Sequence, residues 1–313
     1  MNQDLLGLLQ KLESHMCQVV LGKQDVVRMV LVAVLAGEHI LLEDVPGVGK
    51  TLVAKTLAKS VQGKFSRIQF TPDLLPSDIV GSSVFSSESH EFSFAPGPVF
   101  SNVVLADEIN RTPPRTQSAL LEAMSDRQVS VDGQTHSLPS PFIVIATQNP
   151  FEFEGTYPLP ESQLDRFLLR ISMGYPDRHQ ERQVLASHRD REPVEELDSI
   201  IDCQQIVQLQ QATRQVRIDD AISDYLLDIV HATRECSDLH VGVSTRGALS
   251  LYRGAQAHAM VHGRDYVIPD DVKKLSPLVI AHRVVPKGYL HAGQRTAVEN
   301  LIRELVETIA VPE

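Results

Sequence analysis

The stretch Gly47-Val48-Gly49-Lys50-Thr51 decides the fold of this chain. It follows the apolar run Ile40-Leu41-Leu42 and precedes a helical pattern over residues 52–61. When a buried strand ends in a glycine turn and continues into a helix, backbone N–H groups surround a phosphate and the helix N-terminus adds positive potential. The stretch therefore predicts a phosphate-binding loop.

The loop residues have separate expected roles. Residues 47–52, Leu52 included, would contact the nucleotide; Lys50 would reach its β- and γ-phosphates and the Thr51 hydroxyl would complete the shell of a Mg²⁺ ion. The common pattern is G-x-x-x-x-G-K-[ST], and Asp44 stands where its first glycine would be. A glycine turn with no bound phosphate is the alternative interpretation.

A second motif supports the first. The apolar run 103–106 reads as a buried parallel strand, and it ends in Asp107 and Glu108. Asp107 would hold Mg²⁺ through water, and Glu108 would polarise the water that attacks the γ-phosphate. An apolar run ending in two acids is common by itself, but here a helix and a strand separate it from a phosphate loop.

Two more residues are candidates by position. Asn149 follows the apolar strand 142–146, at the edge where ligands of parallel sheets bind, so its amide would orient the attacking water. An asparagine that starts a turn before Pro150 is the alternative. Arg246 lies in the first turn of a predicted helix, where a cation opposes the helix dipole, which suggests a facing anion; a solvated arginine is the alternative.

The remaining pattern predicts an α/β core followed by a helical region. Residues 1–20 are expected to form an amphipathic helix, residues 72–98 a projecting hairpin-like insertion, and Asp132-Gly133 the turn of a second hairpin. A hinge is expected at 173–176, and from 177 onward the pattern is helical throughout. We therefore expect a nucleotide-binding core at 1–176 and a helical lid at 177–313.

Composition limits the function classes. A net charge of −11 over 313 residues argues against coating nucleic acid by charge. The three cysteines show no metal-ligand spacing, which favours reduced thiols in a cytoplasmic protein. The continuously apolar segment 29–36 is too short to cross a bilayer, and no signal peptide is expected before it.

In combination, these motifs resemble those of an AAA+ ATPase, and more closely those of the MoxR family. The resemblance covers nearly the whole chain. The motifs that carry it are EDVPGVGKT at 43–51, LADEINR at 105–111, ATQNP at 146–150, PLPESQLDRF at 158–167 and VSTRG at 243–247.

The resemblance implies a P-loop AAA+ fold, binding of ATP and Mg²⁺, and ATP hydrolysis. It makes Asn149 the sensor-1 residue, Arg166 the arginine finger that reaches a neighbouring subunit, and Arg246 the sensor-2 residue on the lid. It implies a homo-oligomeric ring, commonly a hexamer, with the two hairpins as pore-facing elements. It also implies a chaperone-like role on protein partners, often ones with a von Willebrand A domain, and sometimes in metal insertion.

Two other functions remain open from the sequence. A DNA-translocating motor of the related helicase type would use the same hairpins, but a DNA-lining tip needs Lys or Arg and residues 86–91 contain Glu88 and Glu91 instead. A nucleotide-gated binding module that hardly hydrolyses ATP is the other. An intact Glu108 and a candidate arginine finger argue against it.

Overall fold

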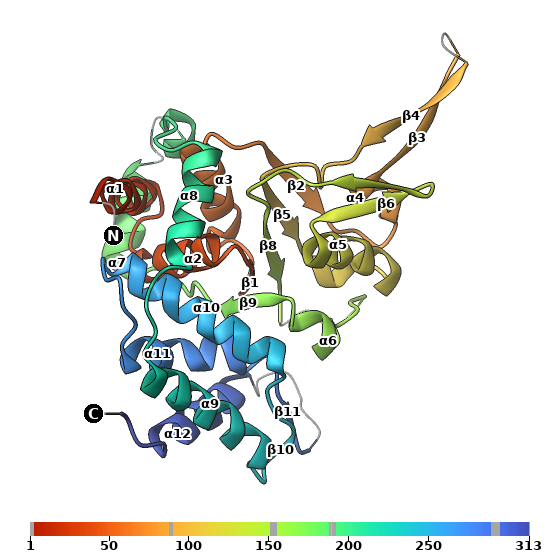
Figure 1. Ribbon diagram of the computed structural model, residues 1–313. Helices are drawn as coiled ribbons and strands as arrows, with labels where there is room; N and C mark the ends of the chain where they lie inside the picture. The colour runs from red at the N-terminus through yellow and green to blue at the C-terminus, as the bar shows by residue number, and fades with distance from the viewer. Residues whose placement is uncertain are drawn as a thin grey trace.

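The computed structural model describes residues 3–87, 90–150, 155–187, 189, 192–288 and 295–312 (Figure 1). Glu88, one of the two acids that argue against the DNA-motor alternative, lies outside the described residues. A five-stranded sheet forms the centre of the molecule, with strand order β2-β5-β8-β1-β9 and every neighbouring pair parallel. Its strands are β1 (His39–Glu43), β2 (Phe65–Gln69), β5 (Val103–Asp107), β8 (Ile143–Gln148) and β9 (Phe167–Ile171).

The inner strands β5, β8 and β1 are buried on both faces, which explains why they are mainly apolar runs rather than alternating ones. In β1, Ile40 and Leu42 enter one core cluster and Leu41 enters the other. The first cluster lies under α1 (Gln3–Val19), α2 (Gln24–Ala36), α3 (Lys50–Ser60) and C-terminal helices, and α5 (Pro114–Asp126) contributes to the second. The expected α/β core with a parallel sheet flanked by helices is confirmed.

Two hairpins extend from this core (Figure 1). The short helix α4 (Pro76–Val80) leads into the long arm of β3 (Gly81–Ser86) and β4 (Glu91–Pro96), within the predicted insertion. The second hairpin pairs β6 (Gln128–Val131) with β7 (Gln134–Ser137). Its turn places Asp132 at φ 50° and Gly133 at φ 77°, the left-handed conformations that a two-residue hairpin turn requires.

The C-terminal part is mainly helical. Its helices are α7 (Arg178–Ser187), α8 (Cys203–Thr213), α9 (Asp220–Glu235), α10 (Thr245–Val261), α11 (Pro269–Ile280) and α12 (Arg295–Glu307). It also holds a two-stranded sheet of β10 (Leu239–Val241) and β11 (Val285–Pro286), which the sequence pattern did not indicate. Three short helices complete the chain: α6 (Glu161–Leu164) and the 3₁₀ turns η1 (Ile109–Arg111) and η2 (Pro193–Glu196). No helix in the described ranges is long and apolar enough to cross a membrane.

His39 ties three elements together at the start of β1. Its Nε2 donates to the backbone carbonyl of Met124, at 3.0 Å, and its Nδ1 accepts from the backbone N–H of Val144, also at 3.0 Å. The ring therefore fits this site only when neutral, because a protonated Nδ1 would face another donor. Burial lowers the pKa of His39 from 6.5 to about 4.

This histidine predicts a specific loss of stability in mild acid. Between pH 6.5 and about 4 the unfolded chain binds a proton at His39 that the folded chain does not, so the free energy of unfolding falls as the pH drops through this window. His39→Gln keeps a donor and an acceptor but does not titrate. Between pH 6.5 and about 4, the free energy of unfolding of this variant should therefore fall by roughly 3 kcal/mol less than that of the parent. Urea unfolding at several pH values measures it.

The exposed His240 on β10 supplies the control. His240→Gln should leave the pH dependence of the parent protein in place. If His39→Gln shows the same slope of unfolding free energy against pH as the parent, His39 is not the group that titrates.

Candidate functional site

The phosphate loop joins β1 to α3 through two glycines in left-handed conformations. Gly47 has φ 82° and Gly49, which precedes the first residue of α3, has φ 95°. A side chain at either φ would be strained, which is why glycine occupies both positions. Lys50 begins the helix, and its Nζ donates to the backbone carbonyl of Asp44 at 2.6 Å.

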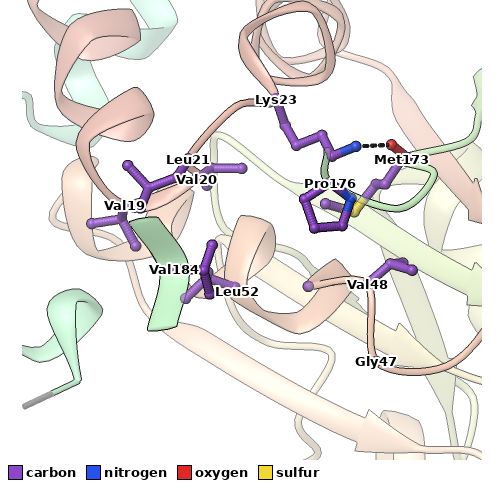
Figure 2. A pocket seen from close by; sticks show the side chains of 11 residues that line it. Val19, Val20, Leu21, Lys23, Gly47, Val48, Leu52, Met173, Pro176 and Val184 are labelled. Carbon is purple, nitrogen blue, oxygen red and sulfur yellow. Dashed lines mark hydrogen bonds between the residues drawn. The ribbon is translucent and has the colours of Figure 1, made fainter. Parts of the chain in front are cut away.

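An apolar pocket lies beside this loop (Figure 2). Its wall is formed by the loop, the end of α1, and the segment between β9 and α7. The lining residues are Val19, Val20, Leu21, Lys23, Gly47, Val48, Gly49, Leu52, Met173, Pro176 and Val184. The predicted contacts Val48 and Leu52 are thus in this wall.

The two predicted acids follow one another at the end of β5, and Thr147 of β8 holds both. The Thr147 Oγ1 donates to Asp107 Oδ1 at 2.6 Å and accepts from the backbone N–H of Glu108 at 2.9 Å. Glu108 has φ 59°, a costly conformation for a residue with a side chain and one that is found most often at functional sites. Thr147 was not predicted from the sequence, because a threonine in an apolar strand reads as an ordinary strand residue.

The edge strand β2 supplies further partners. Arg67 donates to Asp107 Oδ2 at 2.5 Å, and Gln69 donates to Glu108 Oε2 at 3.1 Å. Arg111 pairs with the same Glu108 oxygen at 3.1 Å. These contacts fix the direction of both carboxylates. Neither Arg67 nor Gln69 was predicted, because they come from a different strand and no local pattern connects them to the acids.

Asn149 lies at the same edge of the sheet. It follows β8, which pairs in parallel with β5 so that Ala146 is level with Ala106, and Asn149 is buried. Because the carboxyl ends of parallel strands share one edge, Lys50, Glu108 and Asn149 come together from three neighbouring strands. The structure thus gathers these candidate residues, which are separated by about a hundred positions in the chain.

The donor set at this edge fits Mg²⁺. The Thr51 hydroxyl on α3 and the Asp107 carboxylate on β5 are hard oxygen ligands on two elements that pack against each other. Mg²⁺ usually takes one or two protein oxygens and completes its shell with water and nucleotide phosphates. Among the described residues, no group of three or more His, Cys, Asp or Glu side chains is placed to hold a metal ion.

Arg166 lies at the opposite edge. It directly precedes β9, whose first residue, Phe167, pairs with His39 at the start of β1. Its guanidinium donates to the Leu121 carbonyl and, at 2.7 Å, to Ser125 Oγ, both on α5 of the same chain. Burial, and after it the charge of Arg246, lower the pKa of Arg166.

Arg246 is therefore a neighbour of Arg166 rather than of the phosphate loop. It is exposed in the first turn of α10, and the helix's capping residue, Ser244, donates to Asp165 Oδ2 at 3.4 Å. The length of a five-residue strand, about 15 Å, separates this edge from the phosphate loop. That length exceeds the reach of an arginine side chain from the amino end of the sheet to the loop.

A buried ion pair holds this second edge together. Arg283, three residues after α11, donates to Asp165 Oδ1 at 2.8 Å and to the backbone carbonyls of Phe167 and Leu168. Burial lowers the pKa of Arg283 to about 10, and the charge of Asp165 opposes that shift. The pair fixes the helical region to β9 beside Arg166, and neither residue was predicted.

Comparisons with known proteins agree on a family. Residues 39–169 match the ATPase family associated with various cellular activities (AAA), and residues 231–305 match the AAA lid domain. The chain is 49% identical to protein YeaC of Bacillus subtilis over 99% of this chain and 97% of that protein. It is 42% identical to the chaperone MoxR1 of Mycobacterium tuberculosis over 95% of this chain and 80% of that protein.

A solved structure gives the same result. The crystal structure of a presumed ATPase from Cytophaga hutchinsonii superposes with a TM-score of 0.90 at 36% sequence identity. The match covers 99% of this chain and 96% of that one.

The position of the arginines predicts complementation between defective subunits. Lys50→Ala removes the cation expected at the phosphates, and Arg166→Ala should reduce ATP turnover by about a thousandfold or more, the range for an arginine finger. Each variant alone should be nearly inactive. When the two variants are mixed in one assembly, the intact loop of an Arg166→Ala subunit can face the intact Arg166 of a Lys50→Ala subunit. ATP turnover should therefore reappear in a steady-state assay.

Arg246→Ala should behave in the same way when mixed with Lys50→Ala, and the exposed Arg303→Ala on α12 should retain the parent turnover. A mixture that stays inactive although both variants co-assemble would contradict action between subunits.

Proposed function

Since this chain belongs to the MoxR family of AAA+ ATPases, we propose that it uses ATP hydrolysis to remodel, activate or assemble partner proteins. The observation that carries this proposal is the convergence of Lys50, Glu108 and Asn149 at one edge of the sheet while Arg166 and Arg246 share the other. Such a division suits a site that is completed by a neighbouring subunit.

In the proposed site each residue has one task. The loop amides at 47–51 and the Lys50 ammonium hold the phosphates, while the base occupies the apolar pocket of Figure 2. Thr51 and Asp107 hold Mg²⁺, which when bound neutralises charge on the β- and γ-phosphates. Glu108 orients and polarises the attacking water.

The two arginines support a homo-oligomeric ring. Each would stabilise the charge that develops on the γ-phosphate bound to the next subunit. A fixed cation stabilises such charge most strongly in a site that excludes water. We propose a hexamer, with Arg166 as the finger and Arg246 as the sensor on the lid. In such a ring Arg166 leaves its contacts with Leu121 and Ser125 to reach the neighbour.

The projecting arm supports a protein client. Phe92 is 74% exposed and Phe85 is 52% exposed, and the two rings pack against each other on the arm with centroids 5.3 Å apart. Neither hairpin sequence, 81–96 or 128–137, contains Lys or Arg, which disfavours a DNA-lining role. Arg127, at the base of the second hairpin, donates to the Gly37 carbonyl at 2.7 Å.

Finer assignments follow from the same proposal. The client would be a protein with a von Willebrand A domain or one that receives a metal ion. Residues 1–176 would act as the nucleotide-binding core and 177–313 as the lid. The cytoplasm is the proposed location, in keeping with cysteines 17, 203 and 236, which are free thiols in the structure.

The test uses Glu108→Gln, which should bind ATP and stall because the carboxylate acts on water rather than on bound nucleotide. A client that prefers the ATP conformation should stay attached. Affinity purification with ATP from the native cell should enrich one protein that resists nuclease treatment. Lys50→Ala should not enrich it.

A second variant links the captured protein to the arm. Adding Phe85→Ser and Phe92→Ser to Glu108→Gln should release it while ATP stays bound, as measured by titration calorimetry. Retention of DNA that weakens steeply with added salt, as phosphate contacts require, would replace the chaperone proposal with the DNA-motor function.

A further inference from the structure

Asp44, where the loop departs from the common pattern, makes contacts that a glycine cannot make. Its side chain is buried, and Oδ1 accepts from the backbone N–H of Val45 at 2.8 Å. Oδ2 accepts from Ser172 Oγ at 2.7 Å and from the backbone N–H of Gly174 at 2.6 Å. One carboxylate thus joins the start of the phosphate loop to residues 172–176, the segment that leaves β9 and leads to α7, which we term the linker.

The backbone of Asp44 also contacts both halves of the candidate site. Its carbonyl accepts from Lys50 Nζ at 2.6 Å, and its N–H donates to the carbonyl of Gln148 at 3.1 Å. Gln148 directly precedes Asn149. Asp44 therefore touches the phosphate-binding lysine, the strand that presents Asn149, and the linker.

Lys23, between α1 and α2, is also hydrogen-bonded to the linker. Lys23 Nζ donates to the carbonyl of Met173 at 2.7 Å, drawn in Figure 2, and to that of Tyr175 at 2.9 Å. Lys23, Met173 and Pro176 all line the pocket beside the loop. The linker is thus hydrogen-bonded to the pocket wall and, through Asp44, to the phosphate loop.

Nucleotide would act on this arrangement directly. A bound phosphate competes for the Lys50 ammonium, which in this structure donates to Asp44. Burial alone would raise the pKa of Asp44, but the hydrogen bonds from Ser172, Gly174 and Val45 hold it below its ordinary value, so the acceptor stays charged. Gly174, at φ 62°, gives the linker a turn that can change its backbone angles.

We propose that Asp44 is a positioning residue that couples the phosphate loop to the linker, so that bound nucleotide sets the position of α7 and the helices after it. This inference rests on the proposed function in one respect, that nucleotide occupies the loop. Coupling of this kind is reciprocal: whatever nucleotide does to the linker, the linker does to nucleotide affinity.

Hydrogen exchange of the linker amides, with and without ADP, tests the coupling without relying on turnover. In the parent, ADP should change the exchange rate of the peptide covering 172–176 by about fivefold or more, the lower range for coupled sites. Asp44→Gly introduces the residue of the common loop pattern, so the loop should still bind ADP, with an affinity changed by no more than the coupling factor. The ADP-dependent change should be lost.

Ser172→Ala provides a second variant outside the loop. It removes one of the donors to Asp44 Oδ2, so it should weaken the ADP-dependent change and shift ADP affinity by no more than the same factor, as reciprocal coupling requires. Adding it to Asp44→Gly should have no further effect, because the two residues act through one contact. The exposed Asp198→Gly, in an irregular segment, is the control and should respond like the parent.

The outcomes separate this inference from the proposed function. If Lys50→Ala leaves ADP and ATP affinity unchanged, nucleotide does not occupy this loop and the proposed function fails. If Lys50→Ala weakens binding but Asp44→Gly and Ser172→Ala retain the full ADP-dependent change, only the coupling is overturned. A lower melting temperature with an unchanged response also overturns the coupling, because Asp44 would then be only a structural anchor.

Discussion

The polarity of the parallel sheet is the constraint on which the rest of this structure depends. All five strands point the same way, so their carboxyl ends form one edge and their amino ends the other. The groups proposed to bind phosphate and to orient water follow the strands at the first edge, and Arg166 precedes a strand at the second. In the proposed ring a single subunit would therefore hold two half-sites at opposite edges of the sheet, separated by about the length of a strand.

Buried polar contacts keep the helical region in register with both edges. At one edge, the buried Arg283 is hydrogen-bonded to the partly exposed Asp165 and to the backbone of β9. At the other, Asp44 and Lys23 hold the linker against the nucleotide pocket. The lid is thus connected both to the phosphate loop and to the sheet edge beside Arg166.

The sequence predicted the elements whose signals are local. Apolar runs placed the strands, Asp132-Gly133 placed a turn, and the loop and acid motifs placed Lys50 and Glu108 where the structure has them. Partners from other strands or helices left no local signal, which is why Thr147, Arg67 and Arg283 were not found. The pattern after 177 indicated helices but not the small β10–β11 sheet, whose strands are two and three residues long and too short to show alternation.

A structure of the assembled Glu108→Gln protein with ATP and Mg²⁺ tests the central claim most directly. The quantity to measure is the distance from the Arg166 guanidinium to the γ-phosphate in each neighbouring site. We expect hydrogen-bond contact, about 3 Å, with the nucleotide of the adjacent subunit, while that subunit's own Arg166 stays far from it. Arg166 still bound to α5 at every interface, with another group on the γ-phosphate, would contradict action between subunits.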